Sequence, residues 1–132
     1  MCRNANVHKS RYQSTIVLVE NSGNIILELT FKFALKIIDY SERLSSERKY
    51  VMADQLYRCG TAIGSHVSEA QSPESNADFI HKMKIADKES EESLYRLRLC
   101  KHSKNYPSCD DLIDDLSVIK RILGKIISSS KR

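Results

Sequence analysis

Hydrophobic residues from about residue 31 onward recur at intervals of three and four, which is the period of an amphipathic α-helix. Polar runs and prolines divide this region into four segments. We predict helices over about residues 31–44, 52–70, 76–104 and 110–127. Short connections between successive helices force antiparallel neighbours. The predicted fold class is therefore all-α, an up-down-up-down antiparallel four-helix bundle.

Each predicted helix carries one apolar stripe that we expect to face the core. In the first helix the stripe is Phe31, Ala34, Leu35, Ile38 and Leu44. The other three stripes are Met52, Leu56, Cys59, Ile63, Val67 and Ala70; Phe79, Met83, Ala86, Ser90, Leu94, Leu97 and Cys100; and Leu112, Leu116, Ile119, Leu123 and Ile126.

Two predicted helix starts resemble capping boxes. In Ser75-Asn76-Ala77-Asp78 the serine oxygen can accept a hydrogen bond from an amide of the first turn, and the aspartate can reach back to another amide. A second box-like run, Ser108-Cys109-Asp110-Asp111, precedes the last helix. Acidic residues crowd the start of that helix and basic residues its end, as the helix dipole favours.

The first 30 residues have a different pattern. The β-branched runs at residues 15–19 and 25–29 flank Asn21-Ser22-Gly23-Asn24, which is a hairpin signal. The second run could equally be the lead-in to the first helix. We therefore expect two regions: an N-terminal arm or short hairpin over residues 1–24, and a four-helix bundle domain over residues 25–132.

Composition and charge fit one small folded domain. The 132 residues carry 21 Lys and Arg against 17 Asp and Glu, a formal net charge of +4 that permits anionic partners. No apolar run approaches the ~20 residues that span a bilayer, and no signal-peptide core is visible. The four cysteines form no Cys-x-x-Cys pair. We expect reduced thiols, a cytoplasmic location and no membrane association.

The second predicted helix contains two glycines, four residues apart. Each mid-helix glycine costs about 1 kcal/mol relative to alanine, so some compensating contact is expected. Gly60 and Gly64, with Ala62 and Ser65 beside them, allow either close approach of a neighbouring helix in the same bundle or a contact between subunits. We predict that this helix-packing or oligomer interface also includes His66 and Glu69, which lie three residues apart and can share a helix face.

Catalytic and metal-binding patterns are weak in this sequence. Asp78-x-x-His81 is half of a di-iron carboxylate motif, but that chemistry needs a second copy and two further glutamates. No nucleophile elbow or phosphate-binding glycine loop is present. We therefore predict no enzyme activity, no catalytic residue, no metal and no cofactor.

Basic residues gather toward one predicted end of the bundle. In the expected topology the start of the first helix, the start of the third and the end of the fourth share one pole. We predict nucleic-acid binding there through lysines, namely Lys32, Lys36, Lys82, Lys84 and Lys125. A lysine-decorated surface without a specific ligand is the alternative.

The run from Gln55 to Gln71, followed by Glu74-Ser75 and residues 78–82, resembles the bacterial four helix bundle protein family. That family includes proteins encoded within intervening sequences of large-subunit ribosomal RNA genes. Residues 31–38 and 86–93 match its first-helix and third-helix patterns, although His66 stands where the family usually has Asn.

A related branch comprises the accessory variability determinants of diversity-generating retroelements, which form pentameric barrels, bind nucleic acid and accompany a reverse transcriptase. The resemblance thus implies a bundle, suggests a homopentamer, and favours a non-enzymatic protein that binds RNA or a ribonucleoprotein. The alternative is a scaffold or adaptor that docks a protein partner such as a reverse transcriptase.

Overall fold

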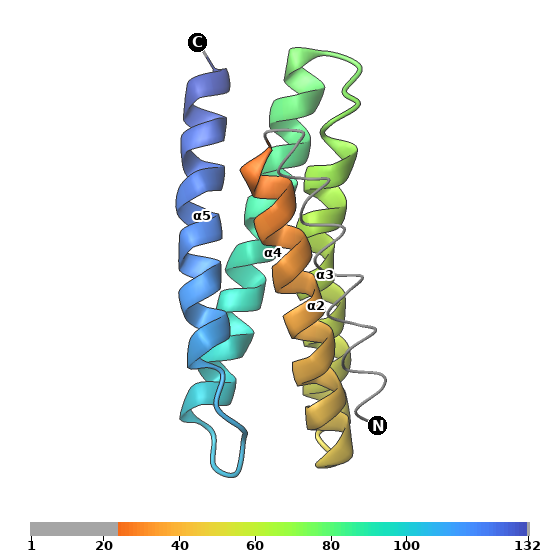
Figure 1. Cartoon of the computed structure of the whole chain (residues 1–132), viewed down its shortest axis with the longest axis vertical. Helices are drawn as coiled ribbons and strands as arrows, with labels where there is room; N and C mark the ends of the chain where they lie inside the picture. The colour runs from red at the N-terminus through yellow and green to blue at the C-terminus, as the bar shows by residue number, and fades with distance from the viewer. Residues whose placement is uncertain (1–23, 132) are drawn as a thin grey trace.

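The computed structural model describes residues 24–131, and this part of the chain is an all-α bundle (Figure 1). Its helices are α2 (Ile25–Ser46), α3 (Tyr50–Glu69), α4 (Asn76–His102) and α5 (Asp110–Ser130). The described residues contain no strand. The predicted fold class is confirmed, with helix boundaries that differ by a few residues.

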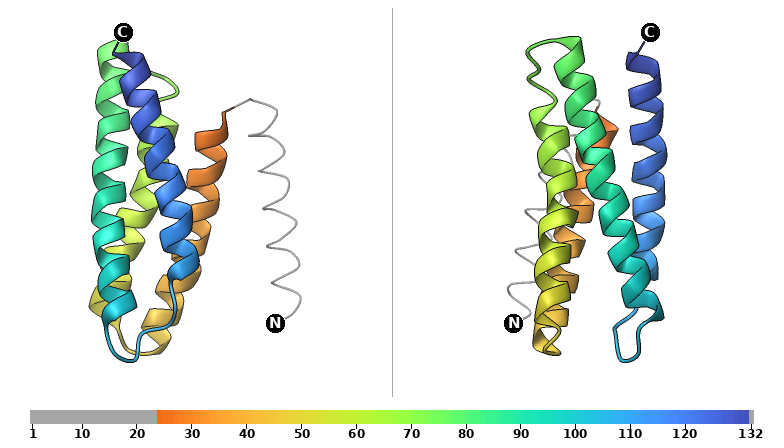
Figure 2. Two further views of the ribbon diagram at one scale, coloured as in Figure 1. Left: turned by 90° about the vertical axis from the view of Figure 1, so that its left-hand side faces the viewer. Right: turned by 180° about the vertical axis from the view of Figure 1, so that it is seen from behind.

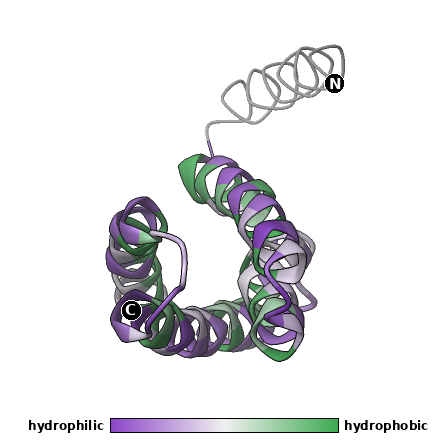
Figure 3. Ribbon diagram, turned by 90° about the horizontal axis from the view of Figure 1, so that it is seen from below, coloured by the Kyte–Doolittle hydropathy of each residue, from purple (hydrophilic) through white to green (hydrophobic). Residues whose placement is uncertain are grey.

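Successive helices run antiparallel and pack on one another, and α5 closes the bundle by packing on α2 (Figure 2). Viewed along the bundle axis, the helices follow the order α2, α3, α4, α5, so α2 and α4 lie diagonally opposite (Figure 3). The core lies between the four helices. Its largest fully buried side chains include Phe33, Ile37, Leu44, Leu56, Ile63, Met83, Leu97, Leu116, Ile119 and Leu123.

The buried face of α2 differs from the predicted stripe. Ile26, Thr30, Phe33, Ile37 and Tyr40 are buried, whereas Phe31 is 40% exposed. The helix carries apolar residues on several sides, so two different stripes fit the helical period. Packing selected the stripe that includes Thr30 and Tyr40, whose hydroxyls donate hydrogen bonds to the carbonyls of Ile26 and Pro107.

The hairpin alternative is wrong for its second run, because residues 25–29 form the first turns of α2. Ile26 is only 1% exposed, and its burial in the bundle outweighs the strand preference of a β-branched residue. The first run, at residues 15–19, and the rest of the predicted arm lie outside the described residues.

The predicted capping box at the start of α4 is confirmed. The amide of Asp78 donates to the Ser75 hydroxyl at 3.0 Å. The Asp78 carboxylate accepts from the amide of Glu74 at 3.0 Å, one residue earlier than the standard box. This backbone hydrogen bond is the largest cause that holds the pKa of Asp78 below its ordinary value, and a hydrogen bond from Lys82 adds a smaller effect.

The second predicted box does not form. The N-cap residue of α5 is Cys109, and its side chain makes no capping hydrogen bond. Its thiol instead donates to the carbonyl of Leu97 in α4 at 3.2 Å, because Cys109 is buried against that helix. The first turn of α5 contains Asp110 and Asp111, whose negative charges interact favourably with the positive end of the helix dipole.

The connection between α3 and α4 holds both ends of the described chain. The side chain of Asn24, just before α2, donates to Gln71 at 2.6 Å. The side chain of Asn76, at the first turn of α4, donates to the carbonyl of Ser130 in the last turn of α5 at 3.1 Å. The start of α2 and the end of α5 therefore lie at the pole that carries this connection (Figure 1).

Candidate nucleic-acid interface

Two of the predicted RNA-binding lysines are in ion pairs along their own helices. The ammonium of Lys32 lies 2.7 Å from the buried carboxylate of Glu28. The ammonium of Lys82 lies 3.3 Å from Asp78, whose carboxylate also accepts from the amide of Glu74 in the capping box. Both lysines have a structural role that reduces the charge they offer to a ligand.

Lys36 does not belong to the basic pole. It lies halfway along α2, and its ammonium contacts Asp115 at 2.7 Å and Asp111 at 3.0 Å on α5. The hydrogen bond that Lys36 donates to Asp115 is the largest cause that raises the pKa of Lys36. The lysine therefore joins α2 to the acidic start of α5, which lies at the other end of the bundle.

The remaining predicted residues, Lys84 and Lys125, are exposed and make no ion pair within the described residues. Lys84 belongs to a longer line on the solvent face of α4. This line was not predicted, although its spacing of three and four residues is visible in the sequence. Its members are all exposed: His81, Lys84, Lys88, Glu91, Tyr95, Arg98 and His102.

The charge of this α4 line is positive. Lys84, Lys88 and Arg98 make no ion pair within residues 24–131, while Glu91 contacts Lys120 of α5. The line extends about 27 Å from Lys84 to His102, at about 1.5 Å per helical residue. Such a row of unpaired cations can contact several phosphates of one nucleic-acid strand.

A shallow groove of about 340 Å³ lies at the C-terminal half of the α4 line. Tyr95, Arg98, Leu99, His102 and Ser103 line it. Tyr95 is 62% exposed and Leu99 39% exposed, so an aromatic and an aliphatic side chain are open to solvent side by side in this groove. The groove thus combines an aromatic ring with the guanidinium of Arg98 and the imidazole of His102.

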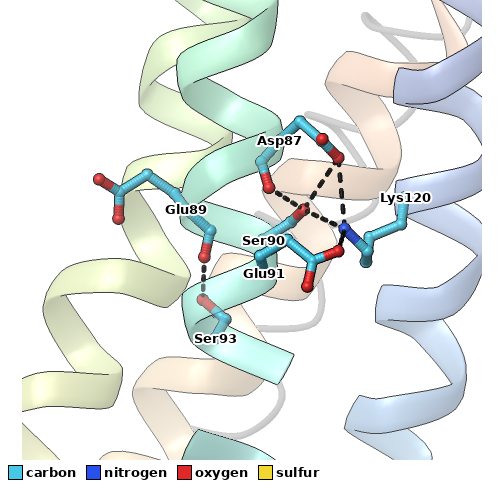
Figure 4. Close-up of polar contacts among 6 residues, drawn as sticks. All are labelled: Asp87, Glu89, Ser90, Glu91, Ser93 and Lys120. Atoms are coloured by element: carbon cyan, nitrogen blue, oxygen red, sulfur yellow. Dashed lines mark hydrogen bonds and ion pairs between the residues drawn. The ribbon is translucent and has the colours of Figure 1, made fainter. Parts of the chain in front are cut away.

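Lys120 is the residue that neutralises the neighbouring acidic part of α4 (Figure 4). Its ammonium contacts Asp87 at 3.3 Å, the Ser90 hydroxyl at 3.4 Å and the carboxylate of Glu91. Ser90 is fully buried and donates to the carbonyl of Asp87 at 2.6 Å. The cluster joins α4 to α5, whereas the carboxylate of Glu89 lies on the other side of α4 and makes no ion pair within the described residues (Figure 4).

The two glycines of α3 face α2 of the same chain. A β-carbon on Gly60 would lie 2.8 Å from both γ-carbons of Ile37, and one on Gly64 would lie 3.3 Å from the carbonyl oxygen of Thr30. Contacts this short cannot form without a shift of the neighbour. At these two positions, close approach of a neighbouring helix in the bundle explains the glycines.

The other predicted interface residues of α3 are less buried. Ala62 lines a polar groove between α3 and α4, beside the charged groups of Arg58 and Arg96. Ser65 is exposed at the rim of an α2–α3 groove. The Nδ1 atom of His66 lies 3.8 Å from the carboxylate of Glu69, so this predicted pair does share a helix face.

The α2–α3 groove has a volume of about 450 Å³ and is mainly apolar. It lies directly outside the close approach made by the glycines. Leu27, Thr30, Phe31, Ala34, Thr61, Gly64, Ser65 and Ser68 line it. Most of the side chains that α3 contributes are small, so the backbone of another helix could come close here.

The described cysteines are buried free thiols. Burial raises the pKa of Cys59, of Cys109 and, to about 11, of Cys100. No group of three or more His, Cys, Asp and Glu residues in the described chain could hold a metal ion. None of the four described helices combines the length and apolar character needed to cross a bilayer.

Comparisons with known proteins agree with this architecture. The sequence model of the family described as 23S rRNA-intervening sequence protein matches residues 23–125. A solved structure from Bacteroides thetaiotaomicron, described as a protein with unknown function from the S23 ribosomal protein family, is 33% identical with a TM-score of 0.74. The match covers 77% of this chain and 97% of that one. No curated protein matches the sequence.

Proposed function

Since the chain belongs to the 23S rRNA-intervening sequence protein family, we propose that it is a non-enzymatic protein that binds RNA through an exposed cationic surface. The α4 line is the observation that carries this proposal. Lys84, Lys88 and Arg98 project from one helix face without ion-pair partners among the described residues. The exposed Lys125 lies in the last turns of α5, at the pole where α5 ends beside the start of α4, and we include it in the proposed surface.

The charge pattern favours RNA over an acidic protein surface because the cations Lys84, Lys88 and Arg98 span about 21 Å along one helix face. A nucleic-acid strand presents phosphates at regular intervals along such a line, and each contact releases bound counterions. Three of the five lysines predicted from sequence are paired with carboxylates, so the surface is centred on α4 rather than on the whole pole.

A salt titration of RNA binding tests the proposal. Fluorescence anisotropy with a labelled single-stranded oligoribonucleotide gives the dissociation constant over a range of salt concentrations. We expect the double variant Lys84→Glu/Lys88→Glu to bind more weakly, and its plot of log K against log salt to be shallower by about 1.4, at about 0.7 for each lost single-strand contact.

The matched control is Arg43→Glu/Arg58→Glu, which changes the net charge equally. These arginines are exposed, lie on α2 and α3, and form ion pairs along their own helices with Glu47 and Asp54. We expect the control to lower the affinity much less. Equal losses of RNA affinity in the two double variants would contradict a localised site. If the unmodified protein bound no RNA at low salt, the proposal would be overturned in favour of the adaptor alternative.

We also propose that the protein assembles, as the resemblance to pentameric relatives suggests, into a ring of five. The α2–α3 groove supports this, because small side chains such as Ala34, Thr61 and Ser65 line an apolar surface there. Assembly would repeat the α4 line around the ring and raise the local density of positive charge.

Light scattering tests the assembly directly. Five copies of the 15.1 kDa chain would weigh about 75 kDa. Ser65→Arg places a long charged side chain at the exposed edge of the α2–α3 groove. We therefore expect this variant to form a smaller assembly, with a lower mass by light scattering. Ser117→Arg, on the exposed face of α5, should keep the mass of the unmodified protein. A 15.1 kDa species for the unmodified protein would overturn the proposal.

A further inference from the structure

Besides the apolar α2–α3 groove, three surface grooves involve α3 or α4, and they differ in charge. The groove around Tyr50 and Tyr57 of α3 contains the carboxylates of Glu42 and Asp54 and no cation. In the groove between α3 and α4, arginines and glutamates balance, as in the pair of Arg96 with Glu92 at 2.9 Å. Only the groove at Tyr95 combines an exposed aromatic ring with positive charge among these three.

The Tyr95 groove contains no carboxylate. Arg98 makes no ion pair, and the side chain of His102 makes no hydrogen bond, within the described residues. The carboxylates nearest in sequence are already occupied: Glu91 by Lys120, Glu92 by Arg96, and Asp110 by Lys101. An anionic group that enters the groove would therefore meet unpaired donors and no free carboxylate of the groove itself.

The groove exposes an aromatic ring beside an aliphatic side chain. Tyr95 is 62% exposed, and Leu99, one helical turn further on, is 39% exposed beside it. Ser103 closes the far end of the groove, with its hydroxyl donating to the carbonyl of Leu99 at 2.6 Å. Aromatic side chains next to cationic ones form the usual platform for unpaired bases of single-stranded nucleic acid.

We propose that the Tyr95 groove binds an unpaired base of single-stranded RNA, with the base stacked on Tyr95 and the flanking phosphates held by Arg98 and His102. The inference rests on the proposed RNA binding and names the part of the RNA that this site recognises. Lys84 and Lys88, further along the same face, would hold the backbone of the same strand.

Two variants of Tyr95 test this inference, with a labelled single strand and a duplex of the same sequence as probes. Tyr95→Ala removes the ring, and we expect it to weaken single-strand binding by roughly 5- to 150-fold, the range for loss of one stacked base. Tyr95→Phe keeps the ring and should retain the affinity. Duplex binding should not change with either variant, because paired bases cannot reach the ring.

A second readout does not depend on affinity. Ultraviolet crosslinking of the single strand, followed by peptide mass mapping, should place the crosslink on the peptide that contains Tyr95. Unchanged single-strand affinity in Tyr95→Ala, with weakened binding in Lys84→Glu/Lys88→Glu, would overturn this inference alone. A change of oligomeric mass in Tyr95→Ala would overturn it too, by assigning this face to a contact between copies.

Discussion

The hydroxyl of Tyr40 donates a hydrogen bond of 2.8 Å to the carbonyl of Pro107, which joins the C-terminal half of α2 to the α4–α5 connection 67 residues later. Both groups are buried. Burial also raises the pKa of Tyr40 above its ordinary value, so the hydroxyl keeps its proton and remains the donor. This bond fixes the α4–α5 connection against the core.

Tyr40→Phe should therefore destabilise the protein by about 1–2 kcal/mol, since the Pro107 carbonyl loses its partner in a place that water does not reach. Urea denaturation followed by circular dichroism measures the change. Tyr57→Phe is the control, because that tyrosine is 48% exposed and its loss of a hydroxyl should cost almost nothing. Equal effects in the two variants would show that the buried hydrogen bond contributes little.

Gly60→Ala should destabilise the protein even though alanine is the better helix former. The new β-carbon would lie 2.8 Å from Cγ1 and Cγ2 of Ile37, a β-branched residue with little freedom in a helix. Overpacking of about 1–3 kcal/mol outweighs the gain in helix propensity.

Gly124→Ala is the matched control for the glycine experiment. A β-carbon there meets no atom within 4 Å, so only the propensity gain remains. We expect stabilisation by about 0.5–1 kcal/mol. If close packing explains Gly60, thermal unfolding should show a lower unfolding temperature for Gly60→Ala and a higher one for Gly124→Ala. Stabilisation of both variants would disprove that explanation.

The buried thiols should resist alkylation in the folded state. With the pKa of Cys100 raised to about 11, only a small fraction is thiolate near neutral pH, and the side chain is 1% exposed. Iodoacetamide should modify it at least roughly 100-fold more slowly than in the unfolded chain. Peptide mass mapping distinguishes each cysteine, and rapid native modification of Cys100 would contradict its burial.

The same thiols should make the protein less stable in alkaline solution. A raised pKa means that the folded state holds the proton more tightly than the unfolded chain. Their contribution is intact below the ordinary thiol pKa of 9.0 and is lost as the pH rises toward the folded value of about 11 at Cys100. Urea midpoints measured over this range should fall, and Cys100→Ala should make the fall smaller.

Ser75→Ala should destabilise the protein by about 1 kcal/mol, because the Asp78 amide loses the oxygen that caps α4. Ser72→Ala, in the same connection, removes a hydroxyl without a capping bond and serves as the control. Urea denaturation of both variants checks the difference. A null effect at Ser75 would mean that water replaces the cap.

The helices were predictable because the apolar period, the prolines and the Ser75 cap all act locally. The buried face of α2 was not, because Phe31 and Phe33 both lie on acceptable stripes and only the neighbouring helices select between them. The predicted cap of α5 was wrong for a similar reason. A contact with another helix decides the position of Cys109, which is buried against α4.

The candidate site shows a similar limit. Lysines can be counted in a sequence, but the pairing of Lys36 with Asp111 and Asp115 joins residues 75 and 79 positions apart. Such contacts depend on how two helices are rotated about their axes. The α4 line, by contrast, requires only the helical period, so Lys84, Lys88, Tyr95 and Arg98 could have been found from sequence.

The short connection between α3 and α4 bonds to Asn24 at one end of the described chain and packs beside Ser130 at the other, through Asn76. A protease that cut between Gln71 and Asn76 would loosen the first turn of α2 and the last turn of α5 in a single event. One broken internal peptide bond would thus act on both ends of the described bundle.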